Sequence, residues 1–335
     1  MKKAPLFLIM EVLGIMLALY ISSFAGETGS SAFDIKGKSL QTFSPKNEIK
    51  ASQEKSPHIV IKSISNFWGD VSSDKTPVNT RMLVEGIDLS GALISIFCSI
   101  YMNDVKMLED RVRNFTAEKK GKNSFVVHFT TYIDNNSEAI IRWWSSHIRN
   151  GEKTRAKIKG ELNIKLGKDN LKCPFLWENE FQTNILEGIN LKNVRNLKFG
   201  VYTLQIKSLT SKWAEITPEY TQIRHTLEIY NPGILPGTPV INSIKYMLFL
   251  NNIKMTEDKI GLPVVIWPKE TKYVSFTTKL ESIKIKKWWI SHIKSNEKTN
   301  YELNYTLFIK FFGLTLAKWQ EKIKGAFDTD FLGRK

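Results

Sequence analysis

A twelve-residue segment occurs twice in this chain, and this repeat constrains the fold more than any other feature of the sequence. Trp143–Thr154 reads WWSSHIRNGEKT and Trp288–Thr299 reads WWISHIKSNEKT, at an offset of 288 − 143 = 145 residues with no gap. Ile61–Ser72 matches Ile206–Thr217 at the same offset. Self-similarity at a fixed offset is the signature of a duplicated structural unit. The length of 335 residues also agrees with two domains, at about 150 residues per domain.

The ends of the matching stretches define the predicted domains. Glu180–Leu186 matches Ala326–Leu332 at an offset of 326 − 180 = 146 residues, and the change from 145 indicates a loop insertion. We therefore predict a first domain at residues 56–188 and a second domain at residues 199–335. The polar residues 189–198 between them are the predicted linker.

Each copy contains short stretches whose residues are typical of β-strands. Leu204–Lys207 alternates apolar and polar residues, and Ile244–Leu250 is strand-like and precedes Asn251-Asn252, which suits a hairpin turn. Tyr301–Phe312 is rich in β-branched and aromatic residues, which pack well on a pleated surface. Several short strands separated by turn signals predict a mostly β protein made of two antiparallel β-sandwiches.

The repeated segment departs from this strand pattern. Ile141, Trp144 and Ile148 are spaced i, i+3 and i+7, which places them on one face of a helix. Ser137 is a suitable helix start, and Asn150-Gly151 is a suitable stop. We therefore predict one short helix in each sandwich, anchored by Trp144 in the first copy and by Trp289 in the second.

The Ser-His pair within the repeat does not have the geometry of a catalytic pair. Consecutive residues on a helix, such as Ser146 and His147 or Ser291 and His292, do not face each other. The remaining histidines form no ligand-spaced cluster, and no nucleotide or cofactor motif is present. We predict no catalytic, metal-binding or cofactor-binding residue and no enzymatic activity, and we interpret the repeat as duplicated scaffold. The sequence leaves open whether Cys98 and Cys173 form a disulfide.

Four tryptophans are candidates for contact with a partner surface. Trp68, Trp143, Trp213 and Trp288 recur at matching positions, and simple packing is the alternative explanation for them. The formal net charge of +15 permits contact with anionic lipid or an envelope polymer, and a chain that is simply rich in lysine throughout is the alternative. The basic residues are scattered without a nucleic-acid-binding motif, so no specific nucleic acid is expected. The oligomeric state is left open.

The N-terminus indicates export. Lys2-Lys3 precedes the apolar stretch Leu6–Ala25, which is long enough for a membrane-spanning helix. We predict an anchor at residues 1–25, a flexible stalk at residues 26–55 and domains outside the membrane. A cleaved signal peptide, and hence a secreted protein, is the alternative. Asn114, Asn135 and Asn304 fit the N-glycosylation pattern, and their modification depends on the compartment.

Two stretches of the second copy resemble a known family. LEIYNPGILPGTPVINSIKYMLFLNNIKM (Leu227–Met255) and LPVVIWPKETKYVSFTTKL (Leu262–Leu280) resemble the late embryogenesis abundant (LEA) type 2 family, whose module is the WHy domain. Archaeal desiccation-related proteins of this family carry the module in tandem behind a hydrophobic segment. The resemblance implies fibronectin-type-III-like (immunoglobulin-like) sandwiches and a non-enzymatic role in water-stress tolerance. The first copy departs from the Asn231-Pro232 element, because it has Gly86–Leu89 at that place.

Overall fold

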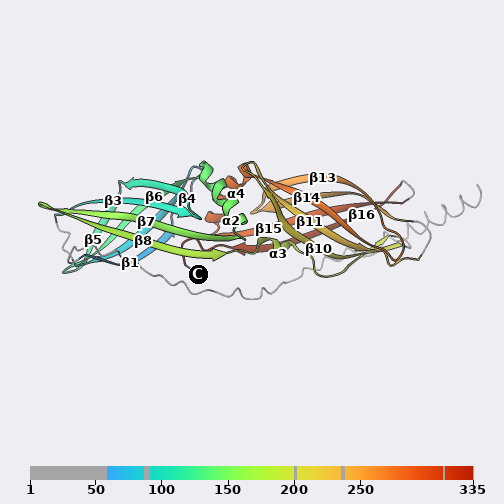
Figure 1. The fold of residues 1–335 in the computed structure, drawn as a ribbon, viewed down its shortest axis with the longest axis horizontal. Coiled ribbons are helices and arrows are strands. Elements are labelled where there is room, and N and C mark those ends of the chain that lie inside the picture. The colour runs from blue at the N-terminus through green and yellow to red at the C-terminus, as the bar shows by residue number, and fades with distance from the viewer. Residues whose placement is uncertain (1–58, 87–90, 200–201, 235–237, 312–313, 335) are drawn as a thin grey trace, which may run out of the picture.

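The computed structural model describes residues 59–86, 91–199, 202–234, 238–311 and 314–334. These residues form two elongated, mostly β halves that lie end to end, and the helices α2 (Glu138–Arg149) and α4 (Ser282–Lys294) meet between them (Figure 1). Each half contains two four-stranded antiparallel sheets. The mostly β, antiparallel fold predicted from the sequence is therefore confirmed.

The first half consists of two sheets and one helix. One sheet has the order β1-β2-β6-β5 and the other has the order β4-β3-β7-β8. The strands are β1 (Val60–Trp68), β2 (Lys75–Glu85), β3 (Leu93–Met102), β4 (Val105–Val112), β5 (Phe115–Gly121), β6 (Ser124–Asp134), β7 (Lys153–Leu166) and β8 (Asp169–Gln182).

The second half repeats this plan with two differences in the sheet that contains β10 and β11. A short strand, β9, is added at one edge, and in the described residues no strand takes the place of β5 at the other edge. Its sheets have the orders β14-β11-β10-β9 and β13-β12-β15-β16. The strands are β9 (Arg195–Phe199), β10 (Tyr202–Ile216), β11 (Tyr220–Tyr230), β12 (Val240–Leu250), β13 (Ile253–Val265), β14 (Thr271–Glu281), β15 (Lys298–Phe311) and β16 (Leu314–Asp328).

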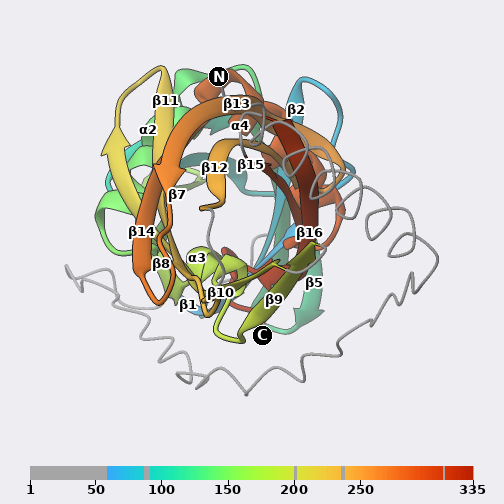
Figure 2. The same ribbon diagram turned by 90° about the vertical axis from the view of Figure 1, so that its right-hand side faces the viewer.

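The alternation of buried and exposed residues along the strands explains why the sheets of each half pack face to face. On β2, Val78, Met82 and Val84 are buried, whereas Arg81 between them is exposed. Successive side chains of a strand point to opposite faces, so one face of the sheet is apolar and the other is polar. Viewed along the long axis, the strands of the second half enclose their core (Figure 2).

Matching hairpins and helices confirm the local predictions. Asn251 and Asn252 have φ of 46° and 63°, and Asn103 and Asp104 have nearly the same values of 49° and 64°. A two-residue hairpin turn of type I′ requires two consecutive residues with positive φ, and Asn and Asp tolerate this conformation. The helix α2 begins after Ser137, whose side chain accepts a hydrogen bond from the Ala139 N–H, as predicted.

The two halves differ where one strand changes sheets. In the first half, β4 ends at Val112 and the chain crosses to the opposite sheet, where β5 pairs with β6. In the second half, β13 stays paired with β12 as far as Val265, so in the described residues no strand covers the outer edge of β14. This crossover gives the first half a fourth strand at a sheet edge that is open in the second half.

The residues predicted as a linker are part of the fold. The short helix α3 (Ile185–Ile189) is followed by Leu191, which pairs with Leu209, and β9 then pairs with β10. α3 also packs against β16 of the second half. The connection between the halves is therefore held against the second domain along much of its length.

The predicted anchor at residues 1–25 and stalk at residues 26–55 lie outside the described residues. Within the described ranges, no helix is both long and apolar enough to cross a lipid bilayer. Cys98 and Cys173 are both buried free thiols, and burial raises the pKa of Cys98 to about 12.

Candidate functional site

The repeated tryptophans lie at the junction between the two halves. Trp143 and Trp288 are each 1% exposed, and their rings stack across the junction. The ring centroids are 6.4 Å apart and the interplanar angle is 9°. The prediction that these two tryptophans are exposed surface contacts is therefore wrong. Each lies on the side of its helix that packs against its own sheets and the facing half, while Glu138, Arg142 and Arg149 of α2 stay exposed on the other side.

The neighbouring tryptophans form hydrogen bonds into the opposite half. The Trp144 Nε1–H donates to Thr221 Oγ1 at 3.0 Å, and the Trp289 Nε1–H donates to Thr76 Oγ1 at 3.2 Å. Both donors and both acceptors are related by the repeat, because 289 − 144 = 145 and 221 − 76 = 145. Reciprocal contacts of this kind are the signature of an isologous interface, in which one surface pairs with its own copy.

Trp68 and Trp213 take part in a second reciprocal pair. They are half-buried at the same junction. The Trp68 Nε1–H donates to Glu297 Oε1 at 2.7 Å, and the Trp213 Nε1–H donates to Glu152 Oε1 at 2.8 Å. Both glutamates are largely buried, so each carboxylate depends on donors that the protein supplies. The packing alternative therefore describes the positions of these two tryptophans in the structure.

A chain of hydrogen bonds connects each glutamate to the repeated histidine. Trp143 donates to Thr154 Oγ1, whose hydroxyl donates to His147 Nδ1 at 2.9 Å. The Nε2–H of His147 donates to Thr183 Oγ1 at 2.9 Å, and Thr183 donates to Glu152 Oε2 at 3.0 Å. Thr183 uses its proton for Glu152, so His147 must carry its own proton on Nε2.

The second copy contains the same chain of hydrogen bonds. His292 lies between Thr299 and Thr329, both at 2.7 Å, and Thr329 donates to Glu297 Oε2 at 2.9 Å. The repeated Trp, His, Glu and Thr side chains therefore form two equivalent networks that meet at the junction. Both ring nitrogens of each imidazole are occupied by threonine hydroxyls, which agrees with the interpretation of the repeat as duplicated scaffold.

Burial controls the charge of these groups. It lowers the pKa of His147 from the usual 6.5 to about 4, so the imidazole is neutral at pH 7. It raises the pKa of Glu297, although hydrogen bonds from the Phe331 N–H, Trp68 and Thr329 oppose this effect. In the described ranges no three His, Cys, Asp or Glu side chains are grouped to hold a metal ion.

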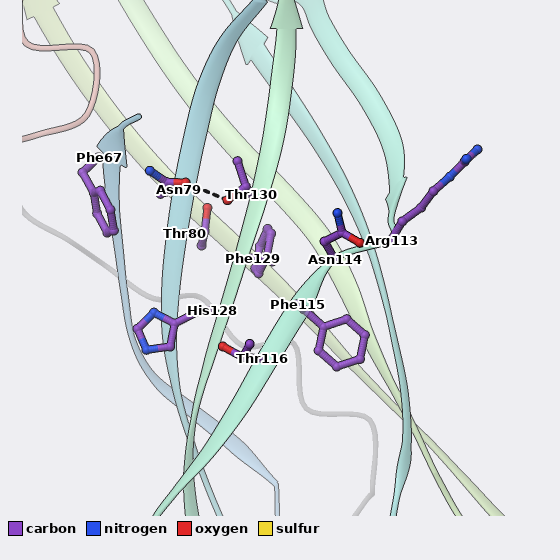
Figure 3. A pocket seen from close by; sticks show the side chains of 10 residues that line it. All are labelled: Phe67, Asn79, Thr80, Arg113, Asn114, Phe115, Thr116, His128, Phe129 and Thr130. Atoms are coloured by element: carbon purple, nitrogen blue, oxygen red, sulfur yellow. Dashed lines mark hydrogen bonds between the residues drawn. The ribbon is translucent and has the colours of Figure 1, made fainter. Parts of the chain in front are cut away.

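A separate groove lies on the outer face of the β1-β2-β6-β5 sheet. It has a volume of about 440 Å³ and extends from β1 to β5 across the sheet (Figure 3). The residues that line it come from all four strands and from the crossover between β4 and β5, and they are Phe67, Asn79, Thr80, Arg113, Asn114, Phe115, Thr116, His128, Phe129 and Thr130.

The register of the strands explains the polar floor of this groove. Phe67, Asn79 and Thr130 lie opposite one another on neighbouring strands and point away from the core. His128 and Thr116 are cross-strand partners in the next outward row. Thr130 Oγ1 donates to Asn79 Oδ1 at 2.7 Å, and the amide nitrogen of Asn79 is turned toward β1 (Figure 3).

The charge around the groove is positive. No acidic residue lines it, whereas Arg113 lies at one rim with its side chain extending away from the strands (Figure 3). At the opposite rim the guanidinium carbon of Arg334 lies over the Phe67 ring, 6.0 Å from its centroid, and Nε donates to Asn66 O at 3.3 Å. Arg334 belongs to the C-terminal end of the second domain, so both domains contribute to the surroundings of the groove.

The corresponding face of the second domain is built differently. The residues in register with Phe67, Asn79 and Thr130 are Lys212, Arg224 and Thr277. That face also lacks a counterpart of β5 among the described strands. The aromatic wall and the amide floor are thus features of the first domain.

No pattern in the sequence indicates this groove. Its polar residues come from four strands, and no spacing in the sequence connects them. The one available signal was the Asn114 glycosylation motif, since Asn114 is exposed and lines the groove. Asn135, in the second such motif, is 1% exposed and its side chain binds Thr76 and Ser72, so the folded protein does not present it.

Comparisons with known proteins give partial likenesses. No protein-family model and no curated protein sequence matches the chain. A crystal structure of a protein from Archaeoglobus fulgidus is 20% identical with a TM-score of 0.35, and the match covers 37% of this chain and 97% of that one. A solution structure of a protein from Arabidopsis thaliana is 12% identical with a TM-score of 0.27, and the match covers 35% of this chain and 74% of that one. A putative beta-galactosidase from Bacteroides fragilis is 10% identical with a TM-score of 0.23, covering 73% and 32% respectively. The chain is similar to each of these in part, and similarity of this extent assigns neither a family nor an activity.

Proposed function

We propose that the chain is a non-enzymatic protein that stands outside the membrane, tethered by its N-terminus, and protects other macromolecules during water stress. One observation carries the non-enzymatic part of this proposal. The repeated histidines and threonines form hydrogen bonds within each domain that hold its buried glutamate, and each glutamate accepts a hydrogen bond from a tryptophan of the other domain. A pair of domains held in this way is suited to act as a scaffold.

The water-stress role rests on the resemblance to the LEA type 2 family, together with its fibronectin-type-III-like sandwich. The Asn231-Pro232 element of that resemblance occupies a structural position. Asn231 is buried, its Nδ2 donates to Ile266 O at 2.9 Å and its Oδ1 accepts from the Gly233 N–H at 3.0 Å. This residue ties the loop after β11 to the turn before β14, and we interpret it as part of the scaffold.

A drying experiment tests the protective role. The full chain in nanodiscs would be dried and rehydrated together with a labile oligomeric enzyme, and the surviving activity of that enzyme would be measured. We expect more surviving activity than with empty nanodiscs plus serum albumin at equal total mass. Equal survival in the two samples would contradict the proposal.

The tether requires its own test, because a secreted protein is the alternative. The intact mass of the chain recovered from native membranes distinguishes the two. A mass that includes residues 1–25 supports the anchor, and a mass that begins at Gly26 supports a cleaved signal peptide.

Binding of an anionic lipid or an envelope polymer is the second candidate function. The specific observation in its favour is the groove on the first domain, which has basic rims and no acidic lining residue. The four tryptophans first considered for this contact belong to the junction, so the groove takes their place as the proposed contact surface.

A further inference from the structure

We propose that the groove on the first domain binds an acidic carbohydrate, through a sugar ring that carries a carboxylate. A hexuronate unit of a surface polysaccharide is one such ligand, because each ring carries one carboxylate. The inference names the ligand class of the groove that is the contact surface in the second candidate function above, and it does not depend on the protective function.

The floor of the groove suits the hydroxyl groups of a sugar. Asn79, Thr116, Thr130 and Asn114 provide amide and hydroxyl groups that both donate and accept hydrogen bonds. Asn79, Thr130 and Thr116 come from neighbouring strands that are about 4.8 Å apart, so these polar groups are spread across the sheet at intervals suited to an extended ligand. Asn114 adds an amide from the crossover before β5. A volume of about 440 Å³ also lies within the range of ~300–1,000 Å³ that is typical of ligand-binding clefts.

The wall at β1 provides an apolar surface for the ring of the sugar. Phe67 is 40% exposed although it is a large aromatic residue, and its neighbour in register, Asn79, is polar. The face of an aromatic ring carries partial negative charge and attracts the C–H groups on one side of a pyranose. Phe67 therefore provides the stacking surface, and Asn79 beside it provides hydrogen bonds to hydroxyls at the ring edge.

The rims of the groove provide the positive charge that an acidic sugar requires. Arg113 and Arg334 lie at opposite ends, and Arg81 is the cross-strand partner of His128. Guanidinium groups pair with carboxylates through two parallel hydrogen bonds. Arg113 is exposed, and exposed side chains exchange rotamers within nanoseconds, so its guanidinium can turn toward a carboxylate in the groove.

The same features argue against a lipid acyl chain as the occupant. An acyl chain needs an apolar channel, and the outward floor residues here are polar. A lipid headgroup would use the arginines but would leave Phe67 and the amide floor without a role. A carbohydrate uses all three parts of the groove.

Calorimetric titration of the full chain in detergent micelles tests the proposal with three soluble probes. Tetragalacturonate carries a carboxylate on each ring, maltotetraose is a neutral tetramer with the same linkage positions, and glycerol 1-phosphate represents an anionic lipid headgroup. We expect tetragalacturonate to bind and the other two to bind at least about tenfold more weakly.

Two groove variants and one matched control locate the binding. Arg113→Gln and Phe67→Ala should each weaken tetragalacturonate binding about tenfold, a change of about 1.4 kcal/mol. Arg224→Gln removes one positive charge from the equivalent face of the second domain, at the position in register with Asn79, and should leave binding unchanged. Arg113 and Arg224 are both exposed, and an unchanged melting temperature would show that each variant folds.

Four outcomes would overturn the proposal. They are an absence of heat with millimolar tetragalacturonate, equal affinity for maltotetraose, tighter binding of glycerol 1-phosphate that Arg113→Gln abolishes, and an equal loss in Arg113→Gln and Arg224→Gln. The third would assign the groove to a lipid headgroup. The fourth would show that the net charge of the whole chain attracts the probe without a site.

Discussion

The two copies of the repeat agree closely at the junction and differ on the outer sheet faces. At the junction the two domains use the same side chains for the same hydrogen bonds, so that Trp68 binds Glu297 just as Trp213 binds Glu152. On the outer faces the residues in register have changed from Phe67 and Asn79 to Lys212 and Arg224.

The chemistry of the two regions explains this difference. A buried polar network must be satisfied completely, since one missing partner leaves a donor or acceptor unpaired in a medium of low dielectric constant. Solvent satisfies an exposed face whatever residues it carries. Side chains on the outer face can therefore change singly and acquire a separate role, whereas those at the junction can change only together.

The tryptophan stack provides the largest test of this comparison. Trp143→Ala and Trp288→Ala should each lower the free energy of unfolding by about 3–5 kcal/mol, because each removes a fully buried aromatic side chain. Chemical denaturation would measure both, with Phe67→Ala as the control that removes an exposed aromatic. The comparison predicts nearly equal losses for the two junction variants. A large loss in one and almost none in the other would show that the junction is not equivalent in its two copies.

Acidification tests the buried imidazoles. Burial lowers the pKa of His147 at the junction and of His225 within the second domain to about 4. The unfolded chain therefore binds protons that the folded chain refuses, so stability present above pH 6.5 is lost as the pH falls toward 4. The lowered pKa of each histidine accounts for a loss of about 3 kcal/mol of unfolding free energy over this interval.

Unfolding free energies measured between pH 7 and pH 4 would check this slope. The raised pKa of Glu297 works in the opposite direction, because the folded state binds that proton at a higher pH than the unfolded chain does. His147→Gln should reduce the number of protons taken up on unfolding by about one, which makes the dependence of unfolding free energy on pH less steep. A profile with the same slope in this variant would exclude His147 as a source of the pH dependence.

A double-mutant cycle tests whether the tryptophan–glutamate bonds cross the junction as described. Trp68→Phe and Glu297→Gln should show a coupling energy of about 1.5–3 kcal/mol, the range for a hydrogen bond to a charged group. Trp68→Phe combined with Glu152→Gln should be additive, since these residues belong to different pairs. Coupling in the second cycle and none in the first would reverse the assignment of partners.

The smallest loss of unfolding free energy is expected for an ion pair at the junction that occurs in only one of the two copies. Lys286 of α4 binds Glu138 of α2, but the residues at the matching positions are Ile141 and Ile283, so this ion pair has no second copy. Glu138 is largely exposed, and exposed ion pairs contribute about 0–1 kcal/mol. Glu138→Gln should therefore lower the unfolding free energy by less than about 1 kcal/mol at 0.15 M salt. A loss comparable to that of Trp143→Ala would mean that this pair is a main determinant of the junction.

The sequence was sufficient to predict the local elements and insufficient to place the repeat in the molecule. Ser137, Trp144 and Asn150-Gly151 predicted the helix, and Asn251-Asn252 predicted the hairpin turn, because these signals act over a few residues. Trp143 is a candidate for contact with a partner surface on sequence grounds alone, with packing as the alternative. It is buried because the facing domain covers its side of the helix, and contact between the two domains has no periodic signal in one chain.

The groove could not be predicted for a related reason. Its floor depends on the crossover from β4 to β5 between Val112 and Phe115, which brings Thr116 beside His128. The matching region of the second domain has a similar strand pattern but continues in the same sheet as β13. The choice between these two paths depends on packing of whole sheets, to which short-range sequence patterns are insensitive.

The self-complementary junction also determines how the molecule responds to dilution. Each domain carries both a donor tryptophan and an acceptor glutamate, so two unconnected domains would associate as a symmetric dimer and separate as their concentration fell. Covalent connection through α3 and Leu191 keeps each domain near its partner at an effective concentration on the order of millimolar. The pairing is then independent of how many copies of the chain are present, which lets a single molecule keep its shape where no second copy is near.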